Sequence, residues 1–170
     1  MRKTLLAANW KMNMTSSETE KYFLEFKNLL KNSEVSDKTS PELIFACPYL
    51  SLSTALKWSK ELGFQAAAQN VHEAEKGAFT GEVSVPMLKE LDLGWVILGH
   101  SERRQYFNET SETVAKKALA SVEAGLKVIA CVGETKEERQ AGQSEERVKE
   151  QLAPLLSLGL DSNKLVIAYE

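Results

Sequence analysis

The sequence predicts an α/β protein with a parallel sheet, and three observations support this fold class. Short apolar runs alternate with longer amphipathic segments throughout the 170 residues, which is the pattern of strands joined by right-handed helical crossovers. Polar residues capable of chemistry follow several apolar runs, at the strand ends where such proteins hold their sites. Small residues such as Ala7-Ala8 and residues 66–68 suit the interior of a closed barrel, although a doubly wound sheet uses small residues as well.

Six strands are expected, and the fourth carries the clearest signal. Residues 95–98 form a continuous apolar run with aromatic and β-branched members, which is typical of a strand buried on both faces. Gly99 lets the backbone turn where this run ends. The predicted strands are residues 5–10, 43–47, 64–68, 95–98, 127–132 and 165–169.

The segments between the strands have helical periodicity. Ser17 and Glu20 have the spacing of a capping box, and Ser111 is expected to cap a later helix that Gly125 closes. Pro154 falls inside the last amphipathic segment, so it either kinks or shortens that helix. Helices are predicted after residues 15–17, over 51–62, near 86–92, between 111 and 125, over 134–141 and from 144 onward.

The composition indicates a single globular domain over residues 1–170. The net charge of -3 gives no reason to propose nucleic acid or an anionic membrane as a partner. No apolar stretch approaches the ~20 residues of a membrane span. The first residues resemble a signal peptide, but Asn9 and Lys11 interrupt the apolar stretch, so a cytoplasmic protein is expected. Cys47 and Cys131 lie inside separate apolar runs and are expected to be buried, reduced thiols.

Residues 93–104 are the segment around which the sequence is organised. A buried strand ends there in His100, Ser101, Glu102 and two arginines. A single histidine in such a place is often satisfied by local hydrogen bonds alone. However, residues 9–11, 131–134 and 169–170 also end apolar runs with polar side chains. The recurrence of polar residues at several strand ends favours a functional site over a structural histidine.

Six segments carry a more specific signal. They are Ala8-Asn9-Trp10-Lys11-Met12-Asn13, Gln69-Asn70, Gly77-Ala78-Phe79-Thr80-Gly81-Glu82, Gly99-His100-Ser101-Glu102-Arg103-Arg104, Cys131-Val132-Gly133-Glu134-Thr135 and Ala168-Tyr169-Glu170. In this order and at this approximate spacing, they resemble the triosephosphate isomerase family over the full length of the chain. One such motif would be weak evidence, whereas several in register are specific.

The resemblance implies a (β/α)8 TIM barrel and an aldose–ketose isomerase of glycolysis and gluconeogenesis. The family interconverts dihydroxyacetone phosphate and D-glyceraldehyde 3-phosphate through an enediolate, with no metal and no organic cofactor. By resemblance, Asn9 and Lys11 bind the substrate, His100 and Lys11 stabilise the enediolate, and Glu170 is the catalytic proton acceptor. Glu102 is implied as an auxiliary acid–base residue. The chemistry agrees, since the reaction needs a base at carbon, a hydrogen-bond donor at oxygen and a cation for the phosphate.

Taken singly, each of these residues has a structural alternative. Asn9 is compatible with a turn, and Lys11 with a solvated surface position. Glu102 could form an ion pair with a neighbouring arginine, and Glu170 could be only a charged chain end. The loop over residues 71–82 is either a mobile surface loop or, as in the family, the loop that enters the neighbouring subunit of a homodimer. In the second case Thr80 and Glu82 are interface residues.

The chain departs from the family pattern at its end. The family barrel has eight strands, and six are predicted here before the chain stops at Glu170. The resemblance therefore implies an incomplete barrel domain that lacks the phosphate-gripping lid and the last two strands. Unpaired strand edges predict that these residues alone are poorly soluble and nearly inactive. Two rivals stay open: another phosphate-binding barrel isomerase, and an inactive fragment or assembly module that needs the missing C-terminal part.

Overall fold

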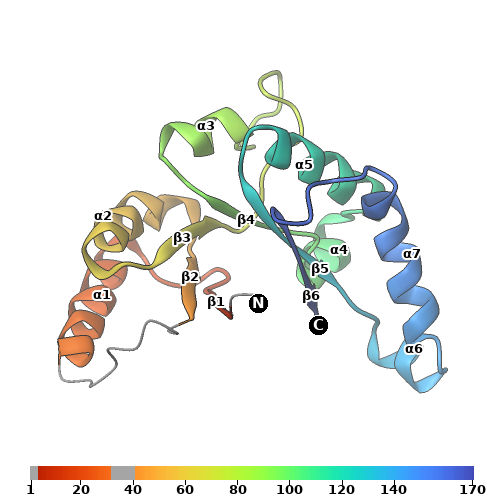
Figure 1. The fold of residues 1–170 in the computed structure, drawn as a ribbon, viewed down its shortest axis with the longest axis horizontal. Coiled ribbons are helices and arrows are strands. Elements are labelled where there is room, and N and C mark those ends of the chain that lie inside the picture. The colour runs from red at the N-terminus through yellow and green to blue at the C-terminus, as the bar shows by residue number, and fades with distance from the viewer. Residues whose placement is uncertain (1–3, 32–40) are drawn as a thin grey trace. The chain divides into compact units, whose positions relative to one another are not determined.

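A computed structural model describes residues 4–31 and 41–170 and divides the chain into two compact units. The first unit holds the described residues up to Gln69 together with Leu91–Gly94, and the second holds Asn70–Glu90 and Trp95–Glu170. In the described part of the chain, six strands alternate with helices (Figure 1), and neighbouring strands within each unit are parallel. The predicted α/β class with six parallel strands is confirmed.

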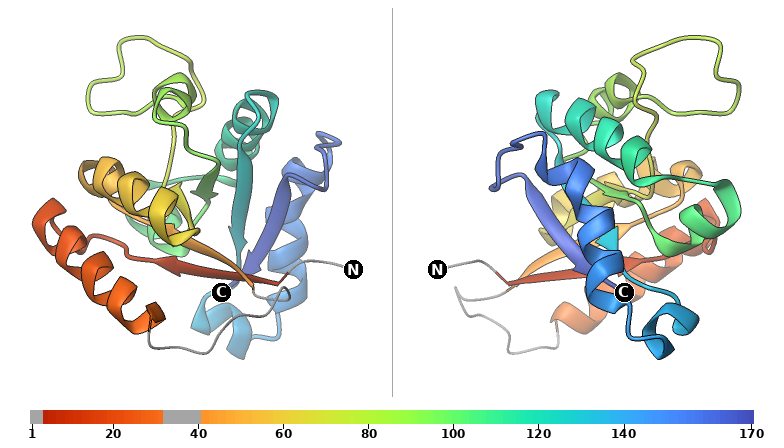
Figure 2. Two further views of the ribbon diagram at one scale, coloured as in Figure 1. Left: turned by 60° about the vertical axis from the view of Figure 1, so that its left-hand side comes forward. Right: turned by 90° about the vertical axis from the view of Figure 1, so that its right-hand side faces the viewer.

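The first unit pairs three strands in parallel. Ala7 lies opposite Ile44, and Phe45 lies opposite Ala66. The two long helices lie side by side on the same side of these strands (Figures 1 and 2). The elements are β1 (Leu5–Asn9), α1 (Ser16–Lys31), β2 (Glu42–Ala46), the 3-10 helix η1 (Tyr49–Ser51), α2 (Leu52–Leu62) and β3 (Gln65–Ala68).

An aromatic cluster forms the core of the first unit. Phe23 of α1 stacks on Phe64 at 4.6 Å between ring centroids and meets Phe45 of β2 edge-on at 5.3 Å. Trp10, directly after β1, stacks on Phe23 at 5.4 Å. Such ring pairs contribute about 0.5–1.5 kcal/mol each beyond the area they bury. The cluster therefore fixes the end of β1 against α1, immediately before Lys11.

The capping box of α1 differs from the predicted pair. The helix begins at Ser16, and Thr15 and Glu18 exchange the two capping hydrogen bonds, at 2.8 and 3.3 Å. Glu20 instead accepts a hydrogen bond from the indole N–H of Trp58 at 2.9 Å. Both pairs have the required spacing in the sequence. The tertiary contact with Trp58 decides between them, because it engages the Glu20 carboxylate.

The second unit contains the other three strands and most of the short helices. Trp95 lies opposite Lys127, and Val128 lies opposite Leu165, so β5 is paired on both sides. The helices α5 and α7 lie side by side (Figures 1 and 2). The elements are α3 (Val85–Glu90), β4 (Trp95–Leu98), α4 (Ser101–Phe107), α5 (Ser111–Glu123), β5 (Lys127–Val132), α6 (Lys136–Gln140), α7 (Ser144–Leu156) and β6 (Leu165–Tyr169).

Three local predictions for this unit need correction. The helix α4 was not predicted, because its seven polar and aromatic residues give too short a pattern. Thr110, not Ser111, is the N-cap of α5, since its hydroxyl accepts from the Thr113 N–H at 3.2 Å. Pro154 does not shorten α7, because the helix continues to Leu156 and Pro154 lies in its last turn; a kink at Pro154 stays a prediction. Among the described residues, no helix is long and apolar enough to cross a membrane.

Candidate active site

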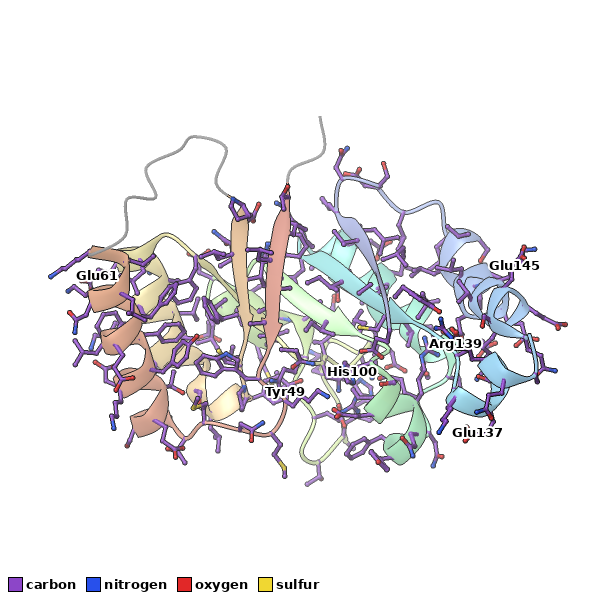
Figure 3. The ribbon with its side chains drawn as sticks, turned by 90° about the horizontal axis from the view of Figure 1, so that it is seen from below. Tyr49, Glu61, His100, Glu137, Arg139 and Glu145 are labelled. Atoms are coloured by element: carbon purple, nitrogen blue, oxygen red, sulfur yellow. The ribbon has the colours of Figure 1, made fainter. Side chains whose placement is uncertain are left out.

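The turn after β4 presents His100 and depends on Gly99. Gly99 has φ +71°, a conformation that side chains disfavour. A Cβ at this position would lie 3.0 Å from Val114 Cγ2 and 3.2 Å from the carbonyl oxygen of Cys131. The chain therefore needs glycine here to turn from the strand into α4. Figure 3 shows His100 beside the first turn of that helix.

The hydrogen bonds of His100 define which ring nitrogen carries the proton. His100 is the N-cap of α4, and its Nδ1 accepts from the backbone N–H of Glu102 at 3.2 Å. An accepting nitrogen has no proton, so the neutral ring carries its proton on Nε2. The Nε2 atom lies 2.9 Å from Oε1 of Glu170. The His100 side chain is only 12% exposed, so its Nε2 is held close to this carboxylate oxygen.

Both carboxylate oxygens of Glu170 lie against the start of α4. While Oε1 faces His100, Oε2 accepts from the backbone N–H of Ser101 at 2.9 Å. The backbone N–H of Glu170 donates to the carbonyl of Val132 at 2.9 Å. Pairing between β5 and β6 thus positions the main chain, and α4 positions the carboxylate. The structure brings His100 and Glu170 together, as the strand-end motifs predicted.

A buried ion pair supports the turn that carries His100. The Glu109 side chain is only 2% exposed, and it accepts from the Gly99 N–H at 3.1 Å and from Lys117 Nζ. Lys117 also donates to Asn70 Oδ1 at 3.0 Å. Sequence reasoning missed this pair, because a Glu and a Lys eight residues apart give no signal of burial. Without its partner, each charge would be costly in the interior.

Arg104 ties the ends of β4 and β5 together. Its guanidinium donates to the carbonyl of Gly99 at 2.8 Å, to the carbonyl of Cys131 at 3.2 Å and to the Ser111 hydroxyl at 3.1 Å. Burial lowers the pKa of Arg104 from its ordinary value. Arg104 therefore acts on the backbone and braces the two strand ends that flank His100 and Glu170.

The two cysteines behave as predicted. Cys47 and Cys131 are both free and buried. Burial raises the pKa of each thiol to about 12, and the nearby Glu170 carboxylate contributes to the shift at Cys131. At neutral pH both are protonated core residues, which argues against a nucleophilic role.

The side chains of Glu134 and Tyr169 form a hydrogen bond beside the end of β6. The Tyr169 hydroxyl lies 2.8 and 2.9 Å from the two oxygens of Glu134, and it donates to this carboxylate. Its hydrogen bond holds the pKa of Glu134 below the usual value, and the carboxylate in turn raises the pKa of Tyr169. Arg139, labelled in Figure 3, lies 3.5 Å from Oε1 of Glu134.

Asn9 and Lys11 lie in the first unit, at the end of β1. Lys11 has φ +54°, a strained backbone conformation for a residue with a side chain. Its N–H donates to Asn9 Oδ1 at 3.0 Å, and its carbonyl accepts from Gln69 Nε2 at 2.9 Å. The side chain of Lys11 is exposed. Gln69 belongs to one of the family motifs, but nothing in the sequence indicates that its side chain holds the Lys11 backbone.

The remaining predicted residues lie in the second unit. Glu102 Oε2 is 3.5 Å from Nδ1 of His100. Thr80 and Glu82 are exposed residues of the loop before α3, and the Glu82 N–H donates to the Phe79 carbonyl at 3.0 Å. Phe79 is 47% exposed, and its ring packs on His72 with 4.1 Å between ring centroids and a tilt of 34°. Within residues 4–31 and 41–170, no three His, Cys, Asp or Glu side chains group as a metal site.

Comparison with known proteins matches residues 4–170 to the triosephosphate isomerase family. A triosephosphate isomerase of Alkaliphilus metalliredigens is 46% identical over all of this chain and 67% of its own length. One from Synechococcus sp. (strain JA-3-3Ab) is 42% identical over all of this chain and 66% of its own. One from Acetivibrio thermocellus is 47% identical over 99% of this chain and 66% of its own. The chain thus spans about two thirds of the length of these relatives.

Parallel strands alternating with helices, with a histidine and a glutamate at the strand ends, place the protein in the TIM-barrel class of enzymes. The match extends over nearly the whole chain and agrees with the motifs in order. The chain belongs to the triosephosphate isomerase family. The predicted family, barrel class and isomerase function are therefore confirmed.

Proposed function

We propose that the protein to which this chain belongs interconverts dihydroxyacetone phosphate and D-glyceraldehyde 3-phosphate, with Glu170 and His100 as the acid–base pair. The observation that carries the proposal is the 2.9 Å contact between Glu170 Oε1 and His100 Nε2. It supports a site in which a base and a neutral donor face the same small space. A carbonyl substrate that enters this space replaces the direct contact with one contact to each group.

The proposed mechanism moves one proton between adjacent carbons. The Glu170 carboxylate removes the proton from the carbon next to the carbonyl, and the electron pair of that C–H bond forms the enediolate. The Nε2–H of His100 stabilises the developing negative charge on the carbonyl oxygen. It gives its proton to that oxygen and takes up the hydroxyl proton of the neighbouring oxygen, while Glu170 returns the carbon proton to the neighbouring carbon. Because Nδ1 of His100 already accepts the Glu102 N–H, the ring enters the reaction as a neutral donor.

Lys11 and Asn9 are proposed to bind the substrate. A lysine supplies a fixed positive charge for a phosphate and for the enediolate. The strained backbone of Lys11, held by hydrogen bonds to Asn9 and Gln69, supports a functional reason for its conformation. Glu102 is proposed as an auxiliary acid–base residue, since its carboxylate lies near Nδ1 of His100.

A homodimer in the cytoplasm is proposed for the whole protein, with Thr80 and Glu82 at the interface. The exposed Phe79 between the glycines of this loop supports an apolar contact with another subunit. Analytical ultracentrifugation of the protein and of Phe79→Ser tests this, since loss of the anchor should shift the mass toward the monomer. A stable, active monomer of the parent protein would overturn the proposal.

A second candidate is an assembly module that turns over only with further residues. Two observations favour it: the relatives are longer, and strand residues such as Leu6 (54% exposed) and Ile167 (41% exposed) have large accessible apolar surfaces. Such surfaces on strands are ordinarily covered.

A coupled assay with D-glyceraldehyde 3-phosphate separates these candidates. We would compare residues 1–170 with a chimera in which the C-terminal third of the Alkaliphilus metalliredigens relative follows Glu170. His100→Asn in each form is the control for contaminating isomerase. If only the chimera shows turnover that depends on His100, the assembly module is supported. If residues 1–170 and the chimera both show it, an active chain is supported. Absence of His100-dependent turnover in both would refute the proposed function.

A further inference from the structure

The buried side chain of Gln151 connects α7 to the turn that follows β5. It is only 4% exposed, although it is an uncharged polar residue on a helix. Its Oε1 accepts the N–H of Gly133 at 2.8 Å, and its Nε2 donates to the carbonyl of the same glycine at 2.8 Å. One side-chain amide thus satisfies both backbone groups of one residue. Buried backbone groups need such partners, because leaving them unpaired is costly.

Gly133 in turn lies directly against the main chain of Glu170. A Cβ on Gly133 would be 3.3 Å from the Glu170 nitrogen and 3.2 Å from its carbonyl carbon, and still closer to the carbonyl oxygen. The preceding residue, Val132, accepts the Glu170 N–H at 2.9 Å. Residues 132–133 therefore hold the backbone from which the Glu170 carboxylate reaches His100.

We propose that Gln151 is a positioning residue for Glu170. Through its paired hydrogen bonds to Gly133, it fixes the backbone against which the main chain of Glu170 packs. The inference rests on the proposed function, in which Glu170 is the base. Gln151 does not touch the Glu170 carboxylate or the space beside His100 in any contact described above. Its effect passes through the backbone of Gly133, so it should change how well the base is placed rather than how the substrate is bound.

The geometry explains why a small displacement matters. A base must lie within about 2.6–3.2 Å of the atom it serves. A misplacement of about 1 Å can cost about a hundredfold in rate. Without the two hydrogen bonds from Gln151, Gly133 is free to move away from α7, and the Glu170 backbone that packs on it moves as well.

The test uses whichever form of the protein shows His100-dependent turnover. Gln151→Met keeps the length of the side chain and removes both hydrogen bonds, so kcat should fall about 10- to 100-fold while KM changes less than about threefold. Gln151→Glu keeps an acceptor for the Gly133 N–H and should recover part of kcat. The matched control is Gln140→Met on the exposed end of α6, which should leave kcat and KM unchanged.

Two further readouts separate positioning from a purely structural role. The acid limb of the pH profile of kcat/KM should move in Gln151→Met, because the carboxylate no longer meets Ser101 and His100 as before. Amide hydrogen exchange at Glu170, measured by NMR, should become about tenfold faster in Gln151→Met and stay unchanged in Gln140→Met. The exchange measurement does not depend on activity, so it decides the proposal even if the protein has no turnover and the proposed function fails.

An unchanged kcat, pH limb and Glu170 exchange rate in folded Gln151→Met would overturn the proposal, even if that variant is less stable. If Gln151→Met does not fold, Gln151→Glu decides. In Gln151→Glu, an intermediate loss of kcat together with faster amide exchange at Glu170 supports the positioning role. Parental values of kcat and of the exchange rate overturn it.

Discussion

The end of β1 in the first unit and the end of β4 in the second hold their functional candidates in opposite ways. At Lys11 the constraint is on the backbone: φ is +54°, two hydrogen bonds hold the main chain, and the side chain is exposed. At His100 the neighbouring Gly99 takes the unusual φ, while the imidazole itself is hydrogen-bonded and only 12% exposed.

The difference follows from what each group must do. Transfer of a proton requires contact at hydrogen-bond distance, so a donor and a base must be held rigidly. A cation acts through a charge interaction that falls off slowly with distance, so a lysine is useful from a longer and less fixed side chain. The second unit accordingly holds the His100 and Glu170 side chains by hydrogen bonds to the first turn of α4, and the first unit fixes the backbone direction in which the chain leaves β1.

The largest expected effect is at Glu170, the proposed base, in the second unit. Glu170→Gln should lower kcat about 10²- to 10⁴-fold, because the amide accepts hydrogen bonds but does not remove a proton from carbon. Thermal unfolding should change little, since the side chain is 30% exposed. Steady-state kinetics beside Glu137→Gln, an exposed glutamate of α6, provides the check. Retention of more than a tenth of the parental kcat would contradict the assignment of Glu170.

The next effect concerns the buried ion pair beneath His100. Lys117→Met leaves the 2%-exposed Glu109 carboxylate with Arg103, whose Nε lies 3.4 Å away, as its only charged partner among those described, and should lower the free energy of unfolding by up to about 3 kcal/mol. Urea unfolding measures this loss. Lys149→Met is the control, because Lys149 pairs with Glu145 on the exposed face of α7 and should matter little. Equal effects of the two variants would mean that the buried pair does not support this unit.

A smaller effect tests the strain at Lys11. Lys11→Ala and Lys11→Gly both remove the cation and should raise KM together, but only glycine relieves the positive φ. The glycine variant should therefore be more stable than the alanine variant by about 1–2 kcal/mol in urea unfolding. Identical stabilities would show that the backbone of the first unit is not strained at this position. The same comparison at His100 should give no such difference, because His100 has a negative φ.

The smallest effect is a pH dependence at Glu134. The Tyr169 hydrogen bond lowers the pKa of this carboxyl below its ordinary 4.5, so its contribution to stability is present above pH 4.5 and is lost as the pH falls through the lowered value. Tyr169→Phe should therefore lower the urea midpoint at pH 6 slightly and should leave it nearly unchanged at pH 3. A larger loss at pH 3 than at pH 6 would have the wrong sign for this linkage.

Sequence patterns predicted the elements best where the apolar runs are short and continuous. Residues 95–98, 127–132 and 165–169 were predicted as strands with the boundaries that the structure shows, because such runs favour strands of a parallel sheet, even though β6 itself is half-buried or exposed along its length. The patterns failed where two neighbouring residues could each cap the same helix, as at the capping box of α1 and at the N-cap of α5. There a single tertiary or local contact decides which residue is the cap.

Sequence by itself determined the α/β class, the six strands and the family, because these follow from apolar periodicity and from motifs that lie along the chain. Only the tertiary structure showed that His100 lies beside Glu170 and how the two are supported: the buried Glu109–Lys117 pair, the bracing by Arg104, and the amide of Gln151 on Gly133. The reason is physical. Polar residues that become buried through distant partners are chemically identical to surface residues in the sequence, and only folding shows which of them lose their contact with water.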